Sequence, residues 1–315
     1  MKKRTIAIIG VGHVGAHCAY SLMMQGLVDE LLLVDNNEQK VASECQDLRD
    51  AVVYCPNHVD IRIAQYDELK DCDIIVNSVG QISLLETGTR LTELNFTIEQ
   101  VNDYIPKVMA GGFDGVIVNI TNPCDIITRQ IALLSGLPKG RVFGTGTGLD
   151  TSRLVSALSQ QTGLDHKSIN AYMMGEHGDQ QMVPWSTVSF AGMPLSALEE
   201  TDARFRFDKE ELKKNAINGG WVTYAGKGCT EYGICTTLAR DVAIILHDEK
   251  RMMPASFELD GEYGEKGLFS GVPCIIGKNG VEQVIELPMT DREKEEFHNC
   301  CEGIRHNMTL NDTVL

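Results

Sequence analysis

The sequence contains no apolar run long enough for a membrane-spanning helix, which needs about 18 to 20 apolar residues. Its first residues are basic and then apolar, as in a signal peptide. However, the apolar part is short and runs directly into a glycine motif, which favours a first buried strand over an export signal. We therefore expect a cytoplasmic protein without a membrane partner.

Cysteine spacing typical of a metal site is also missing. None of the ten cysteines lies in a Cys-x-x-Cys pair, and the adjacent Cys300 and Cys301 suit neither a disulfide nor a zinc site. Without an export signal, all ten cysteines are expected to be free thiols. The sequence thus predicts no disulfide framework and no bound metal ion.

Positive charge is scarce. Lys and Arg number 28 against 44 Asp and Glu, which gives a formal net charge of −16. Such a surface repels the phosphates of nucleic acids and anionic lipids, so neither is an expected partner. If the substrate is itself an anion, a few arginines must create a local positive site against this field.

The pattern that is present indicates an α/β fold. The 315 residues exceed what one core of ordinary size holds, so we expect two closely packed domains. Short apolar runs alternate with segments of helical periodicity, which is typical of βαβ units and a doubly wound parallel (Rossmann) sheet in residues 1–145. The expected strands are residues 5–9, 30–35, 73–79 and 115–120, and the expected helices are residues 16–24, 37–50 and 91–109.

A second, mixed α+β domain that binds substrate is expected for residues 146–315. Its last helix should begin after Thr290, a typical N-cap residue, because Asp291 and Glu293 lie in the first turn. The other expected elements are helices at residues 151–161, 210–224 and 230–247, strand-like segments at 169–174 and 183–190, and a hairpin of residues 272–277 and 281–287 turned by Asn279-Gly280.

Residues 10–15 fit the pattern GxGxxG between a predicted strand and a predicted helix. In this setting Gly10 allows a tight turn, Gly12 lets the backbone approach a pyrophosphate, and Gly15 lets helix and strand pack closely. Asp35, at the end of the next predicted strand, can bond ribose hydroxyls and would repel a 2′-phosphate. The pattern predicts NAD rather than NADP, although a glycine-rich turn beside a surface aspartate is the simpler alternative.

Four further segments place polar side chains where strands end or loops face the expected cleft. His177 lies in a glycine-flanked turn, Asp150 and Arg153 share one helix face, Asn122 follows an apolar strand, and Arg90 ends a polar loop. Each has a plain alternative, such as a surface histidine, a local ion pair or a solvated arginine. Together they supply a proton donor, a carboxylate clamp and a group that polarises a carbonyl, which hydride transfer to a 2-oxo acid requires.

At these motifs the chain resembles the L-lactate/L-malate dehydrogenase superfamily, over essentially its whole length. The shared segments are GVGHVG, the strand end at Asp35, NITNPCD, GTGTGLDTSR and GEHGD, in that order. The resemblance implies that His177 protonates the 2-oxo oxygen, that Asp150 holds its imidazole and that Arg153 binds the substrate carboxylate. It further implies that Arg90 polarises the carbonyl as its loop closes.

The same resemblance assigns the remaining pocket residues. Asn122 is implied to bond near the substrate oxygen and to contact the cofactor. Thr230 and Ile234 are implied to line the substrate and nicotinamide pocket, and His13 and Val14 belong to the cofactor loop. Enzymes of this superfamily are commonly homotetramers and sometimes dimers, so a homo-oligomer is expected. The apolar positions in residues 41–48 suit either a two-fold contact or packing inside the domain.

The substrate is a 2-oxo or 2-hydroxy acid, and the loop before Arg90 bears on which one. Six residues before this arginine, lactate enzymes typically carry Gln and malate enzymes Arg. Here the position is Leu84 or, because the loop is longer, Leu85. An apolar side chain argues against oxaloacetate and favours an aliphatic substrate tail, unless these leucines only pack the closed loop.

The subgroup with the nearest resemblance is the L-2-hydroxyisocaproate dehydrogenases, on the segments Thr87-Gly88-Thr89-Arg90, Trp185-Ser186-Thr187-Val188 and Ala225-Gly226-Lys227-Gly228. We therefore expect NAD-dependent reduction of branched or longer aliphatic 2-oxo acids. L-lactate dehydrogenase is the alternative within the superfamily. A non-catalytic NAD-binding protein is the alternative outside it, although such a protein would need neither the His177–Asp150 pair nor two arginines.

Overall fold

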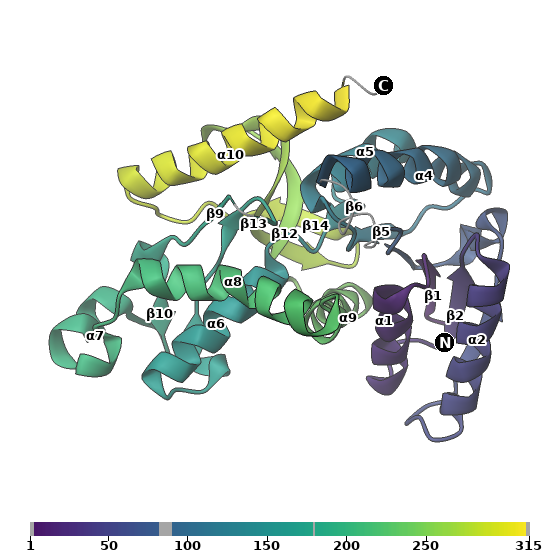
Figure 1. Cartoon of the computed structure of the whole chain (residues 1–315), viewed down its shortest axis with the longest axis horizontal. Helices are drawn as coiled ribbons and strands as arrows, with labels where there is room; N and C mark the ends of the chain where they lie inside the picture. Colours follow the sequence, from purple (N-terminus) through teal and green to yellow (C-terminus); the bar gives the residue numbers. More distant parts are fainter. Residues whose placement is uncertain (1–2, 82–89, 179, 313–315) are drawn as a thin grey trace.

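The computed structural model describes residues 3–81, 90–178 and 180–312. An 11-stranded sheet runs through the molecule, with helices on both faces and a separate 3-stranded sheet at one end (Figure 1). Within these described ranges, no helix is long and apolar enough to cross a membrane.

The first six strands are parallel and lie in the order β3-β2-β1-β4-β5-β6. The chain adds strands on one side of β1 and then returns to add β4 on the other, which confirms the doubly wound sheet. A cleft for a ligand is expected outside the carboxyl ends of β1 and β4, where the order reverses. The strands are β1 Thr5–Ile9, β2 Glu30–Val34, β3 Asp60–Ile63, β4 Ile74–Asn77, β5 Val116–Asn119 and β6 Val142–Gly144.

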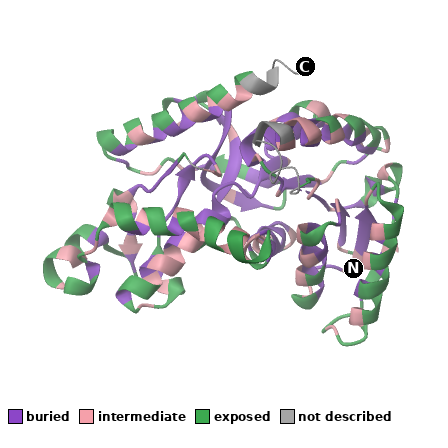
Figure 2. Ribbon diagram, in the orientation of Figure 1, coloured by how far each residue is buried: buried purple, intermediate pink, exposed green. Residues whose placement is uncertain are grey.

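Both faces of this sheet are buried, which explains the continuous apolar runs in its strands. In β1, Ile6 and Ile8 face one hydrophobic cluster, whereas Ala7 and Ile9 face another. Figure 2 shows the buried strands between helices whose outer faces are exposed. The first cluster includes side chains of α1 His13–Met24 and α2 Glu38–Val52, and the second includes those of α4 Arg90–Ala110 and α5 Cys124–Ser135.

The sheet continues into the second half of the chain, where the pairing becomes antiparallel. Ser256 of β12 pairs with Gly144 of β6, and β13, β8 and β9 follow. The strands are β8 Met174–Gly175, β9 Gln181–Met182, β12 Arg251–Asp260, β13 Lys266–Gly277 and β14 Gly280–Val284; the small sheet holds β7 Ile169–Asn170, β10 Ser189–Phe190 and β11 Met193–Pro194. The helices are α6 Gly148–Thr162, α7 Leu195–Thr201, α8 Lys209–Lys227, α9 Tyr232–His247 and α10 Asp291–Asp312.

Two local expectations are wrong, and one element was missed. Residues 183–190 do not form one strand, because Pro184 starts the 3-10 turn Trp185–Thr187 before β10. In the hairpin, Gly280 already pairs with Gly277, so Lys278 and Asn279 form the turn, and Gly280 takes the left-handed conformation with φ +86°. The long strand β12 was not among the expected elements; it pairs with β13 along its length.

The expected cap of the last helix is confirmed. The Thr290 hydroxyl accepts from the Glu293 N–H at 3.3 Å, and the Glu293 carboxylate accepts from the Thr290 N–H at 2.8 Å, so each satisfies a free donor of the other. This helix, α10, contacts β8, β9, β13 and the helices α4 and α5 (Figure 1). It therefore lies against the short strands that carry the GEHGD segment.

Candidate active site

The glycine loop between β1 and α1 has the shape that the sequence predicts. Gly10 has φ +87°, and a Cβ on Gly15 would lie 1.9 Å from the Gly10 carbonyl oxygen. A Cβ on Gly12 would meet nothing within 4 Å, because Gly12 borders two cavities. No described side chain caps the start of α1, so its first N–H groups are free for a ligand. The loop fits a dinucleotide pyrophosphate.

Asp35 follows β2 and is held in place by the main chain. Its Oδ2 accepts from the Val11 N–H at 2.8 Å, and its Oδ1 accepts from the Asn37 N–H at 2.9 Å. Each carboxylate oxygen retains capacity for a further bond. Asp35 thus fastens the glycine loop, a role that the sequence analysis missed, and still faces the cavity as a partner for ribose hydroxyls.

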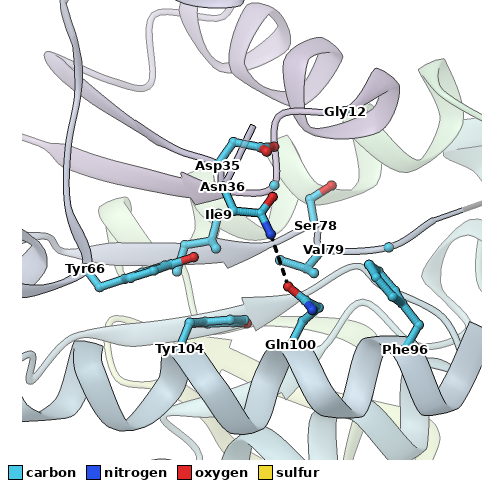
Figure 3. Close-up of a pocket in the computed structure, with 12 residues that line it drawn as sticks. Ile9, Gly12, Asp35, Asn36, Tyr66, Ser78, Val79, Phe96, Gln100 and Tyr104 are labelled. Carbon is cyan, nitrogen blue, oxygen red and sulfur yellow. Dashed lines mark hydrogen bonds between the residues drawn. The ribbon is translucent and has the colours of Figure 1, made fainter. Parts of the chain in front are cut away.

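A cavity of about 130 Å³ adjoins Asp35 and Gly12. Figure 3 shows Asp35 and Asn36 on one side and Gln100 and Phe96 of α4 on the other; the Asn36 amide donates to Gln100 at 3.3 Å. Tyr66 stacks on Tyr104 at one end, with ring centroids 5.6 Å apart. A flat, partly apolar slot beside a ribose-binding carboxylate fits the adenosine half of NAD.

A second cavity of about 820 Å³ joins the glycine loop to the carboxyl ends of β4 and β5 and to α6, α8 and α9. Of the described side chains that line it, Arg153 is the only lysine or arginine. The structure brings most of the predicted site residues to this one space: Gly12, His13, Val14, Asn122, Asp150, Arg153, His177, Thr230 and Ile234.

The His177–Asp150 pair forms the centre of this cavity. The His177 Nδ1 lies 2.5 Å from the Asp150 Oδ2, and Asp150 is only 2% exposed. His177 is carried in by the turn after β8, whereas Asp150 belongs to the first turn of α6. Since Nδ1 is engaged, Nε2 is the ring atom left for a substrate.

Burial and charge compete at this pair. Burial lowers the pKa of His177, but the neighbouring Asp150 outweighs it, and the net pKa of His177 is raised. Burial raises the pKa of Asp150, but His177 and Arg153 outweigh it, and the net pKa of Asp150 is lowered. The arrangement therefore favours an imidazolium beside a carboxylate, which is a poised proton donor.

Arg153 completes the polar centre. Its Nη1 donates to the Asp150 Oδ1 at 3.1 Å and its Nη2 to the Thr230 hydroxyl at 3.4 Å. Gly219 and Gly220 of α8 lie against it, since a Cβ on Gly220 would come within 3.3 Å of both terminal nitrogens. These glycines let the guanidinium lie flat beside α8 and face the cavity, and the sequence analysis did not identify them.

Two further polar contacts were missed. The Asp125 carboxylate accepts from the His177 N–H at 3.1 Å, and the Asn307 amide of α10 donates to Glu176 at 2.8 Å. Asp125 stands in the NITNPCD segment, so its motif was found but not its role, whereas Asn307 carried no sequence signal. Leu84 and Leu85 lie outside the described residues, as does the side chain of Arg90, the first residue of α4.

The dinucleotide-binding sheet, the glycine loop and the His–Asp–Arg centre in one cavity define a nicotinamide-dependent oxidoreductase. The family described as lactate/malate dehydrogenase, NAD binding domain, matches residues 4–144, and its alpha/beta C-terminal domain matches residues 147–313. The chain belongs to the lactate/malate dehydrogenase family. It is an NAD-dependent 2-hydroxyacid dehydrogenase.

Relatives and solved structures agree with this assignment. The chain is 42% identical to an L-lactate dehydrogenase of Fusobacterium nucleatum, over 96% of this chain and 95% of that protein, and 41% identical to L-lactate dehydrogenase 3 of Bacillus cereus, over 98% of each. The minor L-lactate dehydrogenase of Enterococcus mundtii in its ligands-bound form superposes with a TM-score of 0.94 at 34% identity, covering 99% of both chains. Its ligands-unbound form gives 0.86 at 32% identity, covering 100% of this chain and 98% of that chain.

Proposed function

We propose that this protein is an L-lactate dehydrogenase, which interconverts pyruvate and L-lactate with NAD. The observation that carries the proposal is that Arg153, beside the His177–Asp150 pair, is the only lysine or arginine among the described side chains that line the cavity. One arginine suits a substrate with one carboxylate, and the family relatives bear the same name. Both pyruvate and branched 2-oxo acids have one carboxylate, so it is the names of the relatives that favour L-lactate dehydrogenase over the branched-acid prediction.

In the proposed reaction, NAD supplies a hydride acceptor or donor at its nicotinamide ring. Arg153 binds the substrate carboxylate through its guanidinium fork. His177 gives a proton from Nε2 to the carbonyl oxygen during reduction and removes it during oxidation. Asp150 fixes the imidazole through Nδ1 and stabilises its charged form, and Arg90 polarises the carbonyl when its loop closes.

The remaining residues of the site have supporting roles in this proposal. Asn122 would bond near the substrate oxygen and contact the cofactor. Thr230 adjoins the carboxylate through its contact with Arg153. The cofactor lies against the glycine loop (Gly10, Gly12, His13, Val14 and Gly15), Asp35 and Ile234.

A second candidate is the reduction of branched or longer aliphatic 2-oxo acids, as in the L-2-hydroxyisocaproate dehydrogenases. It is favoured by the apolar side chains that α8, α6 and α9 present to the cavity near Arg153, namely Ile217, Trp221, Leu149 and Ile234. A buried methylene contributes about 0.8 kcal/mol, so such a wall can select a longer tail. Leu84 and Leu85, which lie outside the described residues, remain proposed substrate-binding residues of this candidate.

Three properties of the whole molecule are proposed alongside. We propose a division into domains after residue 145 and a cytoplasmic protein, which its ten free thiols support. We also propose a homo-oligomer, a tetramer or a dimer. Residues 41–48 do not support that contact, because Val41, Cys45 and Leu48 are buried in the core.

Another surface suits the oligomer better. Tyr20 and Met24 of α1 and Val53 and Tyr54 after α2 are exposed, and the Met24 sulfur lies 3.8 Å from the Cys55 thiol. The Met24–Cys55 contact brings the end of α1 beside the segment that follows α2, and we propose these exposed apolar side chains as the contact surface. Sedimentation of the purified protein at micromolar concentration tests the assembly, and a monomer alone would contradict it.

The activity is tested by following NADH oxidation with pyruvate, 2-oxoisocaproate and oxaloacetate in parallel. We expect the highest kcat/KM with pyruvate. A higher kcat/KM with 2-oxoisocaproate would overturn this proposal in favour of the second candidate. Turnover of oxaloacetate alone would contradict both, because neither provides a cation for the second carboxylate.

A further inference from the structure

Asp125 is a buried carboxylate directly beneath the catalytic turn. It is the second residue of α5 and is 3% exposed. Its Oδ1 accepts from the Ser256 hydroxyl at 2.5 Å, and its Oδ2 accepts from the His177 N–H at 3.1 Å. Both oxygens are thus bound by the protein, and neither contact involves the imidazole ring.

These two bonds join three segments that are far apart in the sequence. Asp125 lies on α5, three residues after Asn122 in the loop that follows β5. Ser256 lies on β12, where it pairs with Gly144 at the end of β6. Asp125 therefore fixes the backbone of His177 to the sheet and, at the same time, to the segment that carries Asn122.

The fold acts on the charge of Asp125 in two opposite directions. Asp125 lies in the first turn of α5, where the free N–H groups of a helix favour an anion. Burial raises the pKa of Asp125 to about 7, and its bonds with Ser256 and His177 oppose that rise. Its charge consequently changes near neutral pH, within reach of the histidine.

We propose that Asp125 is a positioning residue for the acid–base chemistry: it holds the main chain of His177 and supplies a second negative charge behind the imidazole. The inference rests on the proposed role of His177. Asp150 touches the imidazole ring itself. Asp125 is a second carboxylate, which acts through the main chain of His177 and through its electrostatic field.

The charged groups around His177 can be named from every element that faces it. Asp150 and Arg153 come from α6, Asp125 comes from α5, and Glu176 precedes His177 in the turn. Both aspartates raise the pKa of His177 and Arg153 lowers it, while burial lowers it further. Glu176 acts on the same system through Asp125, whose pKa it raises. Loss of the Asp125 charge should therefore lower the pKa of His177.

The test is the pH dependence of kcat/KM for 2-oxo acid reduction, which falls at high pH as His177 loses its proton. In Asp125→Asn, we expect this fall to begin at lower pH and the rate at alkaline pH to drop about 3- to 10-fold, because one pKa unit is tenfold in the protonated fraction. Asp241→Asn is the matched control, because it removes another buried carboxyl outside the cavity. It should leave the pH at which kcat/KM falls unchanged.

If Asp125→Asn still binds NADH and its kcat/KM falls at the same pH as that of the wild type, the proposal is overturned. If this variant does not fold, Asp125→Glu and Asp125→Gln replace it, since they share size and differ in charge; equal pH profiles for the two would also overturn it. If the wild type reduces no 2-oxo acid, the proposed function fails separately. In that case the pKa of His177 is measured by NMR in the wild type and in Asp125→Asn, with the signal assigned by its absence in His177→Asn. An equal pKa in the two proteins would overturn the proposal for Asp125.

Discussion

The cofactor side and the substrate side of the main cavity are formed by different kinds of chemical groups. On the cofactor side, main-chain N–H groups and missing side chains shape the surface, as at Gly10, Gly12 and Gly15. On the substrate side, ionisable side chains do so, and the buried Asp150 connects His177 to Arg153. Substitutions on the cofactor side should act through steric overlap, whereas those on the substrate side should act through charge and proton transfer.

The substitution with the largest expected effect is His177→Asn, which changes the substrate side alone. Removal of a general acid typically lowers turnover by a factor of about 10² to 10⁴, and we expect kcat for 2-oxo acid reduction to fall within that range. The glycine loop is untouched, so NADH should bind with its normal affinity in a fluorescence titration. Full turnover by this variant would disprove the role of the histidine, and lost NADH binding would show that the two sides are not separable.

The cofactor side is tested by two alanine substitutions that differ only in position. In Gly15→Ala, the new methyl group would lie 1.9 Å from the Gly10 carbonyl oxygen. We expect this overlap to destabilise the fold by about 1 to 3 kcal/mol or more, seen as a lower melting temperature together with loss of NADH binding.

Gly12→Ala is the matched partner, because its Cβ meets no atom within 4 Å and Gly12 faces the cavity. We expect a nearly normal melting temperature but weaker NADH binding, on the order of tenfold or about 1.4 kcal/mol, since the methyl group occupies the path of the pyrophosphate. Equal melting temperatures for the two variants would contradict this account of the loop.

The same contrast explains what the sequence could predict. The doubly wound sheet, Asp35 and the His177–Asp150 pair depend on periodicity and on ordered motifs, and these are visible in one chain. Gly219, Gly220 and Asn307 reach the site through the packing of α8 and α10, which no local pattern encodes. The strand β12 was missed for a related reason: Pro254 opposes a strand locally, but pairing with β13 along its length prevails.

Asp241, outside the main cavity, provides a contrast with the aspartates of the site. It lies in the middle of α9, is 0% exposed, and neither carboxyl oxygen has a hydrogen-bond partner among the described residues. Burial raises its pKa well above the usual range, against a small opposing influence of Arg240. The folded protein therefore holds this group in its neutral form, whereas Asp150 is held as an anion by its partners.

A raised pKa in the folded state gives a defined pH dependence. Between the unfolded pKa of about 4 and the raised folded pKa, the folded protein binds one more proton than the unfolded chain. The free energy of unfolding therefore falls as the pH rises through this range. Asp241 therefore reduces the free energy of unfolding least below about pH 4, and this reduction grows as the pH rises towards the folded pKa. We expect Asp241→Leu to increase the free energy of unfolding at pH 8 by about 1 to 3 kcal/mol, the cost of an unsatisfied buried group. The gain should shrink at pH 5, and thermal unfolding at both values measures it; equal gains at the two pH values would contradict a neutral Asp241, because an aspartate ionised in both the folded and the unfolded state binds no proton at either pH.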